Sequence, residues 1–441
     1  MTAMEHDLKT VARRIFQQTL AAIDIQAAIA RRLERDGTRI RAGAEYIDLR
    51  EFREIVVIGF GKASVAMAEG FQSVVAPDFR VDGILVSPKP VAGGALREWK
   101  SFVGGHPLPT AESFAAGRAI LDRMARCDER SLVVFLISGG GSSMVEQPLD
   151  TGVGLVDFQA LHSVLVTCGA PIEEINVVRK HLSATKGGRL AAAAPNSLKL
   201  TLALSDVPSG YESALASGPT LPDPSTVADA ERVVNHPGVM NGLPPAIREI
   251  FAEHRLKETP KENDRVFARN IFELLLGEHD LVHRAHHCSE AEGIRCMADN
   301  QTDGWTLESA TDELLAQLTA LQRDCPGKRV AILSGGEVSS PVTGDGIGGR
   351  NSAFVLTCVP KIAGKKIVVL SAGTDGIDGN SPAAGAVADG ETQSRAARVG
   401  MDPAEYSRRS DAYNFFAKLN DAIVTGPTGN NLRDLRIIIS G

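Results

Sequence analysis

The chain has 441 residues, of which 43% are hydrophobic and 23% charged, and its formal net charge is −7. This composition is typical of a globular protein, and at this length we expect two domains. The negative charge argues against a nucleic-acid partner, which would require a basic patch. No apolar run reaches the roughly 18 residues of a membrane span. Six scattered cysteines without a Cys-x-x-Cys pair indicate reduced thiols and a cytoplasmic protein.

Short apolar runs alternate with helical stretches from residue 55 onward. In the first half of the chain these runs are EIVVIG (54–59), GILVS (83–87), LVVFLIS (132–138) and KLTLALS (199–205). They are apolar on both faces, which indicates parallel strands covered by helices on both sides of a sheet. The alternation predicts a Rossmann-like, doubly wound α/β domain.

A segment rich in proline and charge, residues 221–265, interrupts this alternation. We place the domain boundary within it, between an N-terminal domain of residues 1–240 and a C-terminal domain of residues 241–441. Strand-like runs return in the second domain, for which we expect another α/β fold. These runs are RVAILS (329–334), KIVVLS (366–371) and DLRIIIS (434–440).

One local pattern occurs in both predicted domains. VVFLISGGGSS (133–143) and VAILSGGEVSS (330–340) are nearly the same, and LALSDVPSG (202–210) and VVLSAGTDG (368–376) are looser versions. In each, a buried strand ends at a serine, and small or acidic residues follow. A single such loop is more often a simple turn. Several together at the carboxyl ends of strands, where open α/β sheets bind ligands, predict an anion or phosphate site.

Two cations stand in the glycine-rich loops: Lys62 in GFGKAS and Arg350 in GDGIGGRN. Each can offset the charge on a transferring phosphoryl group. Lys62 alone could be a solvated lysine at a helix start. Arg350 lies between glycines and an asparagine, which suits bidentate contact with phosphate or carboxylate. We predict that both residues are catalytic.

Carboxylates follow several of the same strands, and such groups can hold Mg²⁺, which binds phosphate through oxygen ligands and keeps several waters. Asp375 alone could instead cap a helix. The predicted magnesium ligands are Asp206, Glu337, Asp375 and Asp378.

The remaining predicted contacts share exposed backbone N–H groups, hydroxyls or positive charge. Either cation of VVRKH could meet the substrate carboxylate, and the histidine of GGHPLP could line the site or brace a rigid turn. The predicted substrate or phosphate contacts are Gly61, Ser64, His106, Ser138, Gly139, Gly140, Gly141, Ser142, Ser143, Arg179, Lys180 and Asn351. The predicted nucleotide contacts are Gly335, Gly336, Gly348, Gly349 and Thr374.

GFGKAS partly matches two nucleotide-binding fingerprints and satisfies neither. As a dinucleotide motif it has Ser64 in place of the third glycine, and the next strand ends in VSPKP, without an acidic residue for a ribose. As a P-loop it has Val56 in place of the first glycine and Ala63 in place of the Ser/Thr. An NAD(P)H-dependent reductase is therefore the less favoured alternative.

A second cluster, His279, His283, His286, His287 and Cys288, lies on one predicted helix. Histidines at i and i+4 can bind zinc. The interleaved charged residues favour a solvated helix face over a metal site.

Taken together, these motifs resemble the class II glycerate 2-kinase family, whose C-terminal region is called the MOFRL domain, here about residues 328–439. Some members of the family are labelled hydroxypyruvate reductase. The resemblance runs from about residue 10 to the C-terminus, and its motifs are GFGKAS, GGHPLP, FLISGGGSS, INVVRKHLSATKGGRLA, LSDVPSG, LSGGE, GIGGRN and SAGTDGIDG.

The resemblance implies two α/β domains around a cleft that binds ATP and Mg²⁺. It also implies phosphorylation of the 2-hydroxyl of D-glycerate to give 2-phosphoglycerate and, by analogy, a homodimer. In this family the lysine of the GKAS motif and the arginine of the GGRN motif are regarded as essential. The resemblance assigns these positions to Lys62 and Arg350.

Several loop residues depart from the family pattern. Most family members have Gln-Glu after GRN, an aspartate soon after SDVP, another aspartate before AAGA, and Gly-Thr-Asn near the C-terminus. The residues that stand at or beside these places are Ser352, Ala353, Tyr211, Pro382 and Asn430. They remove polar groups but leave both cations, so the acceptor stays open between glycerate and a related hydroxy acid, such as a four-carbon sugar acid.

Overall fold

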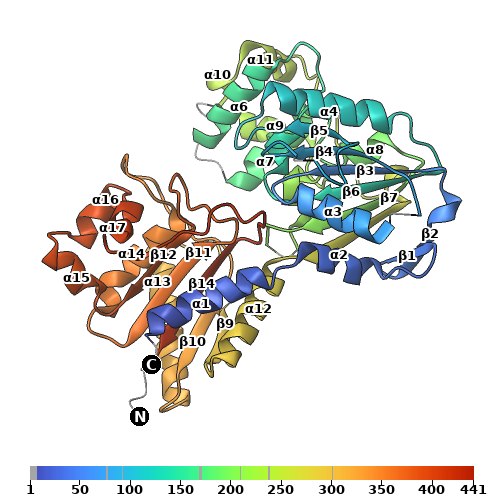
Figure 1. Ribbon diagram of the computed structural model, residues 1–441. Coiled ribbons are helices and arrows are strands. Elements are labelled where there is room, and N and C mark those ends of the chain that lie inside the picture. Colours follow the sequence, from blue (N-terminus) through green and yellow to red (C-terminus); the bar gives the residue numbers. More distant parts are fainter. Residues whose placement is uncertain are drawn as a thin grey trace. The chain divides into compact units, whose positions relative to one another are not determined.

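The structure is a computed structural model that describes residues 7–75, 78–91, 93–167, 171–208, 210–236, 239–299 and 301–441. The chain divides into two compact units. The N-terminal unit is Ile25–Leu275, and the C-terminal unit is Leu276–Gly441 together with Met1–Asp24. Figure 1 shows the dark blue helix of the chain's start lying along the orange and red strands of its end.

The domain boundary differs from the predicted one between residues 240 and 241. Residues 241–275 stay with the N-terminal unit, because β8 (Asn270–Leu276) is the last strand of its sheet. Conversely, α1 (Leu8–Ala21) belongs to the C-terminal unit, where Lys9 forms an ion pair with Asp421 (3.0 Å). Proline and charge are frequent in residues 221–265, but the pairing of a later strand decides which unit this segment joins.

The N-terminal unit contains a six-stranded sheet with the order β5-β4-β3-β6-β7-β8. Counted from β3, this is the Rossmann order 3-2-1-4-5-6. The pairs β4–β5, β3–β4, β3–β6 and β6–β7 are parallel, which confirms the predicted doubly wound α/β fold. The first five strands in chain order are β3 (Glu54–Phe60), β4 (Val81–Ser87), β5 (Lys100–Val103), β6 (Ser131–Ile137) and β7 (Leu198–Leu204).

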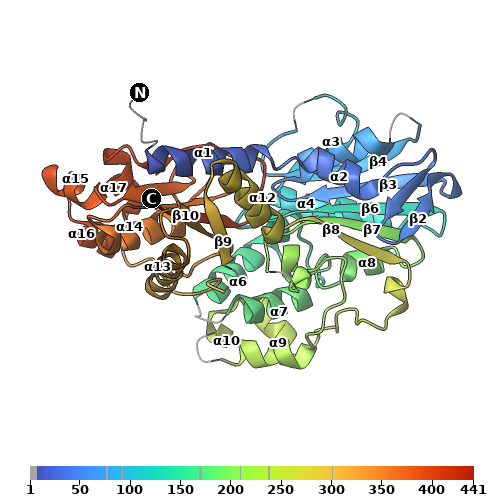
Figure 2. The same cartoon turned by 90° about the horizontal axis from the view of Figure 1, so that it is seen from below.

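Helices cover both faces of this sheet, as continuous apolar strands require. Figures 1 and 2 show α2 (Ile25–Leu33) and α3 (Ser64–Val75) on one face, and α4 (Ala111–Met124) and α8 (Arg189–Ala193) on the other. A buried cluster joins α4 and α8 to the strands. Burial of each large apolar side chain contributes about 1.5–3 kcal/mol, so this packing holds the strand ends in place.

The remaining elements of the N-terminal unit are a hairpin, a helical cluster and short helices. The helices α6, α7, α9, α10 and α11 share one apolar cluster. The elements are β1 (Arg39–Ala42), β2 (Glu45–Asp48), η1 (Leu49–Glu51), α5 (Gly141–Met144), α6 (Leu155–Thr167), α7 (Ile172–Leu182), η2 (Glu212–Ser217), α9 (Val227–Val234), α10 (Val239–Gly242), α11 (Pro245–Ala252) and η3 (Arg265–Phe267).

The C-terminal unit contains a mixed sheet with the order β13-β12-β11-β14-β10-β9. Its last strand, β14, is antiparallel to both β10 and β11, so these two strands run in the same direction. Ser334 lies opposite Arg436, and Gly373 lies opposite Asp434. The carboxyl ends of β10 and β11 therefore meet the start of β14 at one edge. The strands are β9 (Arg295–Asp299), β10 (Val330–Ser334), β11 (Ile367–Gly373), β12 (Gly385–Asp389), β13 (Ala422–Ile423) and β14 (Asp434–Ser440).

Helices also cover both faces of the second sheet, with α1 and α12 on one side and α13 and α14 on the other (Figures 1 and 2). Buried side chains of α13 and α14 form a core with the strands. The helices after α1 are α12 (Glu278–Ala291), α13 (Leu307–Asp324), α14 (Arg350–Ile362), α15 (Thr392–Arg398), α16 (Pro403–Arg408) and α17 (Ala412–Lys418).

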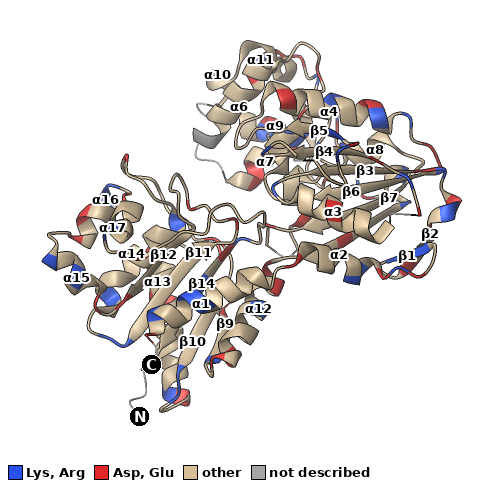
Figure 3. Ribbon diagram, in the orientation of Figure 1, with Lys and Arg blue, Asp and Glu red and all other residues tan. Residues whose placement is uncertain are grey.

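Charged residues lie mainly on helices and loops. In both units positions of Lys and Arg are interspersed with those of Asp and Glu, and the strands carry few charges (Figure 3). Within the described ranges, no helix is both long enough and apolar enough to cross a bilayer.

Candidate functional site

Two glycine-rich loops meet where the strand order of the N-terminal sheet reverses. Phe60, the last residue of β3, lies opposite Ile137 at the end of β6. In the loops that follow, the backbone N–H of Lys62 donates to the carbonyl oxygen of Gly139 (2.9 Å), and that of Ala63 donates to the Ser138 hydroxyl (3.0 Å). The two loops therefore form one backbone surface at the position where this fold binds ligands.

Two of the predicted glycines are required by the geometry of these loops. Gly61 has a φ of +116°, and a Cβ atom there would lie 2.4 Å from the Ser138 carbonyl oxygen. Gly140 has a φ of +81°, and its Cβ would lie 3.4 Å from Cγ of Lys62 and 3.5 Å from Nδ1 of His106. Only glycine fits both positions without strain. The side chains of Lys62 and His106 border the loop at Gly140.

A cavity of about 350 Å³ opens beside this loop, within the size range of small-molecule sites. The Nδ1 atom of His106 lies 3.3 Å from the Ser143 hydroxyl, and the Ser142 hydroxyl bonds that of Ser217 (2.8 Å). The predicted residues that line the cavity are His106, Gly140, Ser142, Ser143, Arg179 and Asp206.

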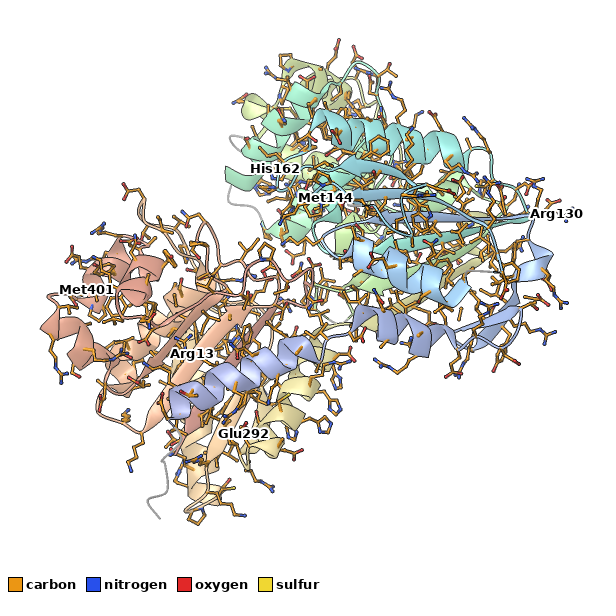
Figure 4. The ribbon with its side chains drawn as sticks, in the orientation of Figure 1. Arg13, Arg130, Met144, His162, Glu292 and Met401 are labelled. Carbon is orange, nitrogen blue, oxygen red and sulfur yellow. The ribbon has the colours of Figure 1, made fainter. Side chains whose placement is uncertain are left out.

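Arg179 supplies positive charge to the cavity from α7. Its Nη2 donates to Nδ1 of His162 (2.7 Å), which lies on α6 (Figure 4). Burial, with the charge of Arg179, lowers the pKa of His162 to about 4, so this ring is neutral near pH 7. Among the described residues, no carboxylate lies within ion-pair distance of Arg179. A partly buried guanidinium that has a neutral histidine as its neighbour can form a forked hydrogen bond with a carboxylate.

The neighbouring Lys180 has a different role from the predicted one. Its Nζ bonds Oδ1 of Asp223 (3.1 Å), and both side chains are buried away from the cavity. Successive helical residues point about 100° apart, so only one of the two cations in VVRKH can face the ligand. Lys180 belongs to the interior and Arg179 to the cavity wall.

A buried ion pair that was not predicted from the sequence lines the cavity wall. Nζ of Lys186 donates to Oε2 of Glu146 (2.6 Å), and both side chains are buried. Burial lowers the pKa of Lys186, although the charge of Glu146 opposes that shift. The available signal was Gly187–Gly188, since both residues have positive φ and such a pair marks a backbone turn beside Lys186. His162, Asn176 and Ser217 also line the cavity without having been predicted.

In the C-terminal unit, Arg350 begins α14 between two carboxylates. Its Nε lies 2.5 Å from Oδ2 of Asp434, and its Nη2 lies 2.7 Å from Oε1 of Glu337. Burial would lower the pKa of Arg350, but both carboxylates outweigh it and raise the pKa. The side chain is 39% exposed, so part of this charged guanidinium is accessible from solvent.

The predicted nucleotide glycines lie in packed loops around Arg350. Arg436 is buried beneath the first pair and donates to the carbonyl oxygens of Gly335 and Gly336. The N–H of Gly348 donates to Asn380 (2.8 Å), and a Cβ at Gly349 would lie 2.3 Å from Oδ1 of Asp378. Close packing explains why these positions are glycines, and their contact with a nucleotide stays a prediction.

Several predicted ligand contacts instead brace the backbone. Asp378 is buried and accepts the N–H groups of Asn351 and Ser352 (2.9 Å each), so it caps α14 rather than facing a metal. The buried Thr374 donates to the Arg433 carbonyl (2.7 Å) and accepts from the N–H of Leu432 (2.8 Å).

Two further predicted contacts are internal. The Asn351 side chain is buried and accepts from the Ser371 hydroxyl (2.6 Å). The Ser64 hydroxyl is buried and donates to the Val86 carbonyl (3.0 Å). Both lie beside ligand-facing loops in sequence, but their polar atoms point into the fold.

The departures from the family pattern have unequal consequences. Ser352 accepts from the Gly349 N–H (3.2 Å) and donates to Asp378 (2.6 Å), which stabilises the start of α14. Its hydroxyl is therefore used within the fold. Tyr211, in contrast, is 59% exposed.

We expect Asp378→Ala to lower the free energy of unfolding by about 1–3 kcal/mol, because buried N–H groups at the start of α14 lose their acceptor. Urea denaturation measures the change. Asp375→Ala is the control, since Asp375 is only half buried and should cost less. An unchanged stability of Asp378→Ala would contradict the capping role.

Because Asp378 caps α14, the other predicted magnesium ligands are the candidates for binding the ion. Within the described ranges, no group of three or more His, Cys, Asp or Glu side chains could hold a metal ion. The described histidines of α12 do not form such a group, although Nε2 of His283 lies 3.1 Å from Nε2 of His287. An Mg²⁺ ion that arrives on a phosphate needs only one or two protein carboxylates, and Asp206, Glu337 and Asp375 are half-buried candidates.

The chain is similar to known proteins over most of its length. Residues 11–252 match a family described as a domain of unknown function (DUF4147), and residues 330–434 match the MOFRL family. The chain is 34% identical to the D-glycerate 2-kinase of Thermotoga maritima, over 90% of this chain and 93% of that protein. It is 35% identical to a putative hydroxypyruvate reductase of Agrobacterium vitis, over 100% of this chain and 96% of that protein.

A solved structure is similar over nearly the whole chain. The crystal structure of a glycerate kinase of Thermotoga maritima superposes with a TM-score of 0.82 at 31% identity and covers 98% of this chain and 99% of that chain. The similarity therefore extends over both units.

Proposed function

Because the chain belongs to the class II glycerate 2-kinase family and is an ATP-dependent glycerate kinase, we propose that it phosphorylates the 2-hydroxyl of D-glycerate, or of a closely related hydroxy acid, to give 2-phosphoglycerate and ADP. The observation that carries the acceptor assignment is Arg179, a cavity-wall cation whose hydrogen-bond partner is a neutral histidine. Its guanidinium binds the acceptor carboxylate in this proposal.

The acceptor occupies the cavity beside the loop 138–143. Its carboxylate faces Arg179, and its hydroxyls meet the hydroxyl groups of Ser142 and Ser143. Phosphoryl transfer has a loose transition state, so positioning and charge provide most of the rate and no strong general base is needed. The buried pair of Lys186 and Glu146 fixes the wall against which the acceptor rests.

Lys62 and Arg350 offset the charge of the transferring phosphoryl group. Lys62 borders the loop 138–143, and Arg350 is held by Asp434 and Glu337. When bound with ATP, Mg²⁺ neutralises phosphate charge, and Glu337, Asp375 or Asp206 would hold it. A cytoplasmic location and a homodimer stay predictions.

Hydride transfer is the alternative that the name of one relative suggests. In the Rossmann fold an acidic residue after the second strand binds the ribose of the dinucleotide. Here β4 ends at Ser87, whose hydroxyl donates to the carbonyl of Lys89 (2.7 Å), and no carboxylate stands in VSPKP. We expect no NADH oxidation with hydroxypyruvate.

We expect ADP release from ATP with D-glycerate, and its loss when EDTA removes Mg²⁺. A panel of 2-hydroxy acids with three or four carbons identifies the acceptor, and phosphorus NMR of the product identifies the esterified hydroxyl. Product esterified at the 3-hydroxyl, or NADH oxidation without ADP release, would contradict the proposal.

A further inference from the structure

Arg433 adopts a backbone conformation that its residue type rarely takes. It precedes β14 with a φ of +69°, in the left-handed region that favours glycine or asparagine. Its side chain is only 6% exposed. An arginine in this strained and buried position is held by Thr374, whose hydroxyl donates to its carbonyl (2.7 Å), and by its own side-chain contacts.

Those contacts are charge-assisted and forked. Nη1 of Arg433 lies 2.6 Å from Oε2 of Glu278 and 2.9 Å from Oδ2 of Asp303, and Nη2 lies 2.7 Å from Oδ1 of Asp303. Fork-shaped pairing of a guanidinium with a carboxylate fixes both groups in orientation. Arg433 thus fixes Asp303, which lies after β9.

Asp303 connects this clamp to the catalytic arginine. Its Oδ1 accepts the backbone N–H of Glu337 (2.8 Å), and Glu337 forms the ion pair with Arg350 (2.7 Å). Arg350 also bonds Asp434, which follows Arg433 in the chain. The contacts form a closed ring from Arg433 through Asp303, Glu337, Arg350 and Asp434.

Arg433 also balances negative charge near Arg350. The carboxylates in this network belong to Glu278, Asp303, Glu337 and Asp434. Without Arg433, Glu278 and Asp303 would lose their ion-pair partner close to the place where phosphates are expected, and the buried Arg436 would be left to offset their charge. A polyanion would then be repelled, and the loop of Glu337 would lose its anchor.

We propose that Arg433 is a positioning residue that holds the Glu337 loop and offsets its acidic neighbours, so that Arg350 can receive the phosphates of a nucleoside triphosphate. This proposal rests on the proposed function. Arg433 contacts neither substrate; it acts through Asp303 and Glu337.

The test uses Arg433→Asn, because asparagine tolerates the left-handed backbone. The substitution removes the guanidinium without adding backbone strain. We expect the KM for ATP to rise by about tenfold or more, with the KM for D-glycerate within about threefold of wild type. The fall in kcat should be smaller than in Arg350→Ala, because Asp434 still holds Arg350. Part of the increase is electrostatic, so it should shrink between about 0.05 and 0.5 M salt, as screening increases. Arg433→Lys should recover part of the affinity for ATP.

Lys361→Met is the matched control for loss of one cation. Lys361 also pairs with two carboxylates, Glu308 (2.7 Å) and Asp312 (2.6 Å), but near the other end of α14. Its KM for ATP should equal that of wild type. Thermal melts of all variants show whether each is folded.

A folded Arg433→Asn enzyme with a wild-type KM for ATP would overturn the proposal. So would an equal rise of the KM for ATP in Lys361→Met. A third contrary result is a fall in kcat alone that matches the fraction of unfolded enzyme. Calorimetric binding of ATP to wild type and Arg433→Asn gives a readout independent of turnover. If wild type binds ATP and the variant binds it weakly, but no hydroxy acid is phosphorylated, the proposed function fails and the role of Arg433 stands.

Discussion

Lys62→Ala is expected to lower kcat by about 10²–10³-fold, the typical effect of losing one preorganised charge at a transition state. The backbone N–H of Lys62 holds the Gly139 carbonyl, and alanine keeps that bond. The substitution therefore removes the ammonium group and keeps the backbone contact between the two loops. Steady-state kinetics with ATP and D-glycerate measure the change, and a thermal melt shows whether the variant is folded.

Arg350→Ala should lower kcat as strongly but should also reduce stability, because Asp434 is only 3% exposed and would lose its cation. Arg350→Lys separates the two effects. It keeps a positive charge beside Asp434 but not the fork that can bind two oxygens, so stability should recover more than kcat. Near-normal turnover in either alanine variant would reject the assignment of these two cations.

The sequence predicted the first sheet well because burial on both faces leaves a direct signal. EIVVIG and LVVFLIS are continuous apolar runs, and both are buried central strands. The second sheet shows the limit of that signal. DLRIIIS has the same character, yet β14 is antiparallel to both of its neighbours. Apolarity indicates a buried strand and carries no information about its direction.

The candidate site was predictable where it follows from chain order. Loops that follow neighbouring strands meet, so Gly61, Lys62 and the run 138–143 could be grouped in advance. Pairs formed across long separations could not. Lys186 and Glu146 are 40 residues apart and have no shared motif. They meet because the segment after α7 lies beside the segment after α5, where the N–H of Ala184 donates to the Gln147 carbonyl (2.7 Å).

Residue type also fails to separate ligand-facing from structural side chains in one motif. Asp375 and Asp378 stand in the same loop, but only Asp378 is fully buried as an acceptor of α14 N–H groups. The two carboxylates differ because Asp378 meets the start of α14, which begins at Arg350, well before this loop in the chain. Local sequence therefore identifies the loop and leaves the role of each carboxylate to the tertiary structure.

Arg179 and Lys180 give the sharpest test of that distinction. Arg179→Met should raise the KM for D-glycerate by about 10–100-fold, because a hydrogen bond to a charged group contributes about 1.5–3 kcal/mol. Its stability should be little changed, since the guanidinium has no carboxylate partner among the described residues. Kinetics at saturating ATP and urea denaturation measure the two quantities.

Lys180→Met should show the opposite pattern. It leaves the buried Asp223 without its cation, and breaking a buried pair costs about 3–5 kcal/mol. Asp223 keeps the Ser225 hydroxyl as a donor (2.8 Å), which places the loss toward the lower end. Lys180→Met combined with Asp223→Asn should recover much of the stability, because no buried charge remains unpaired. A KM effect in Lys180→Met at full stability would instead place Lys180 on the ligand, and the assignment of the acceptor carboxylate to Arg179 would fail.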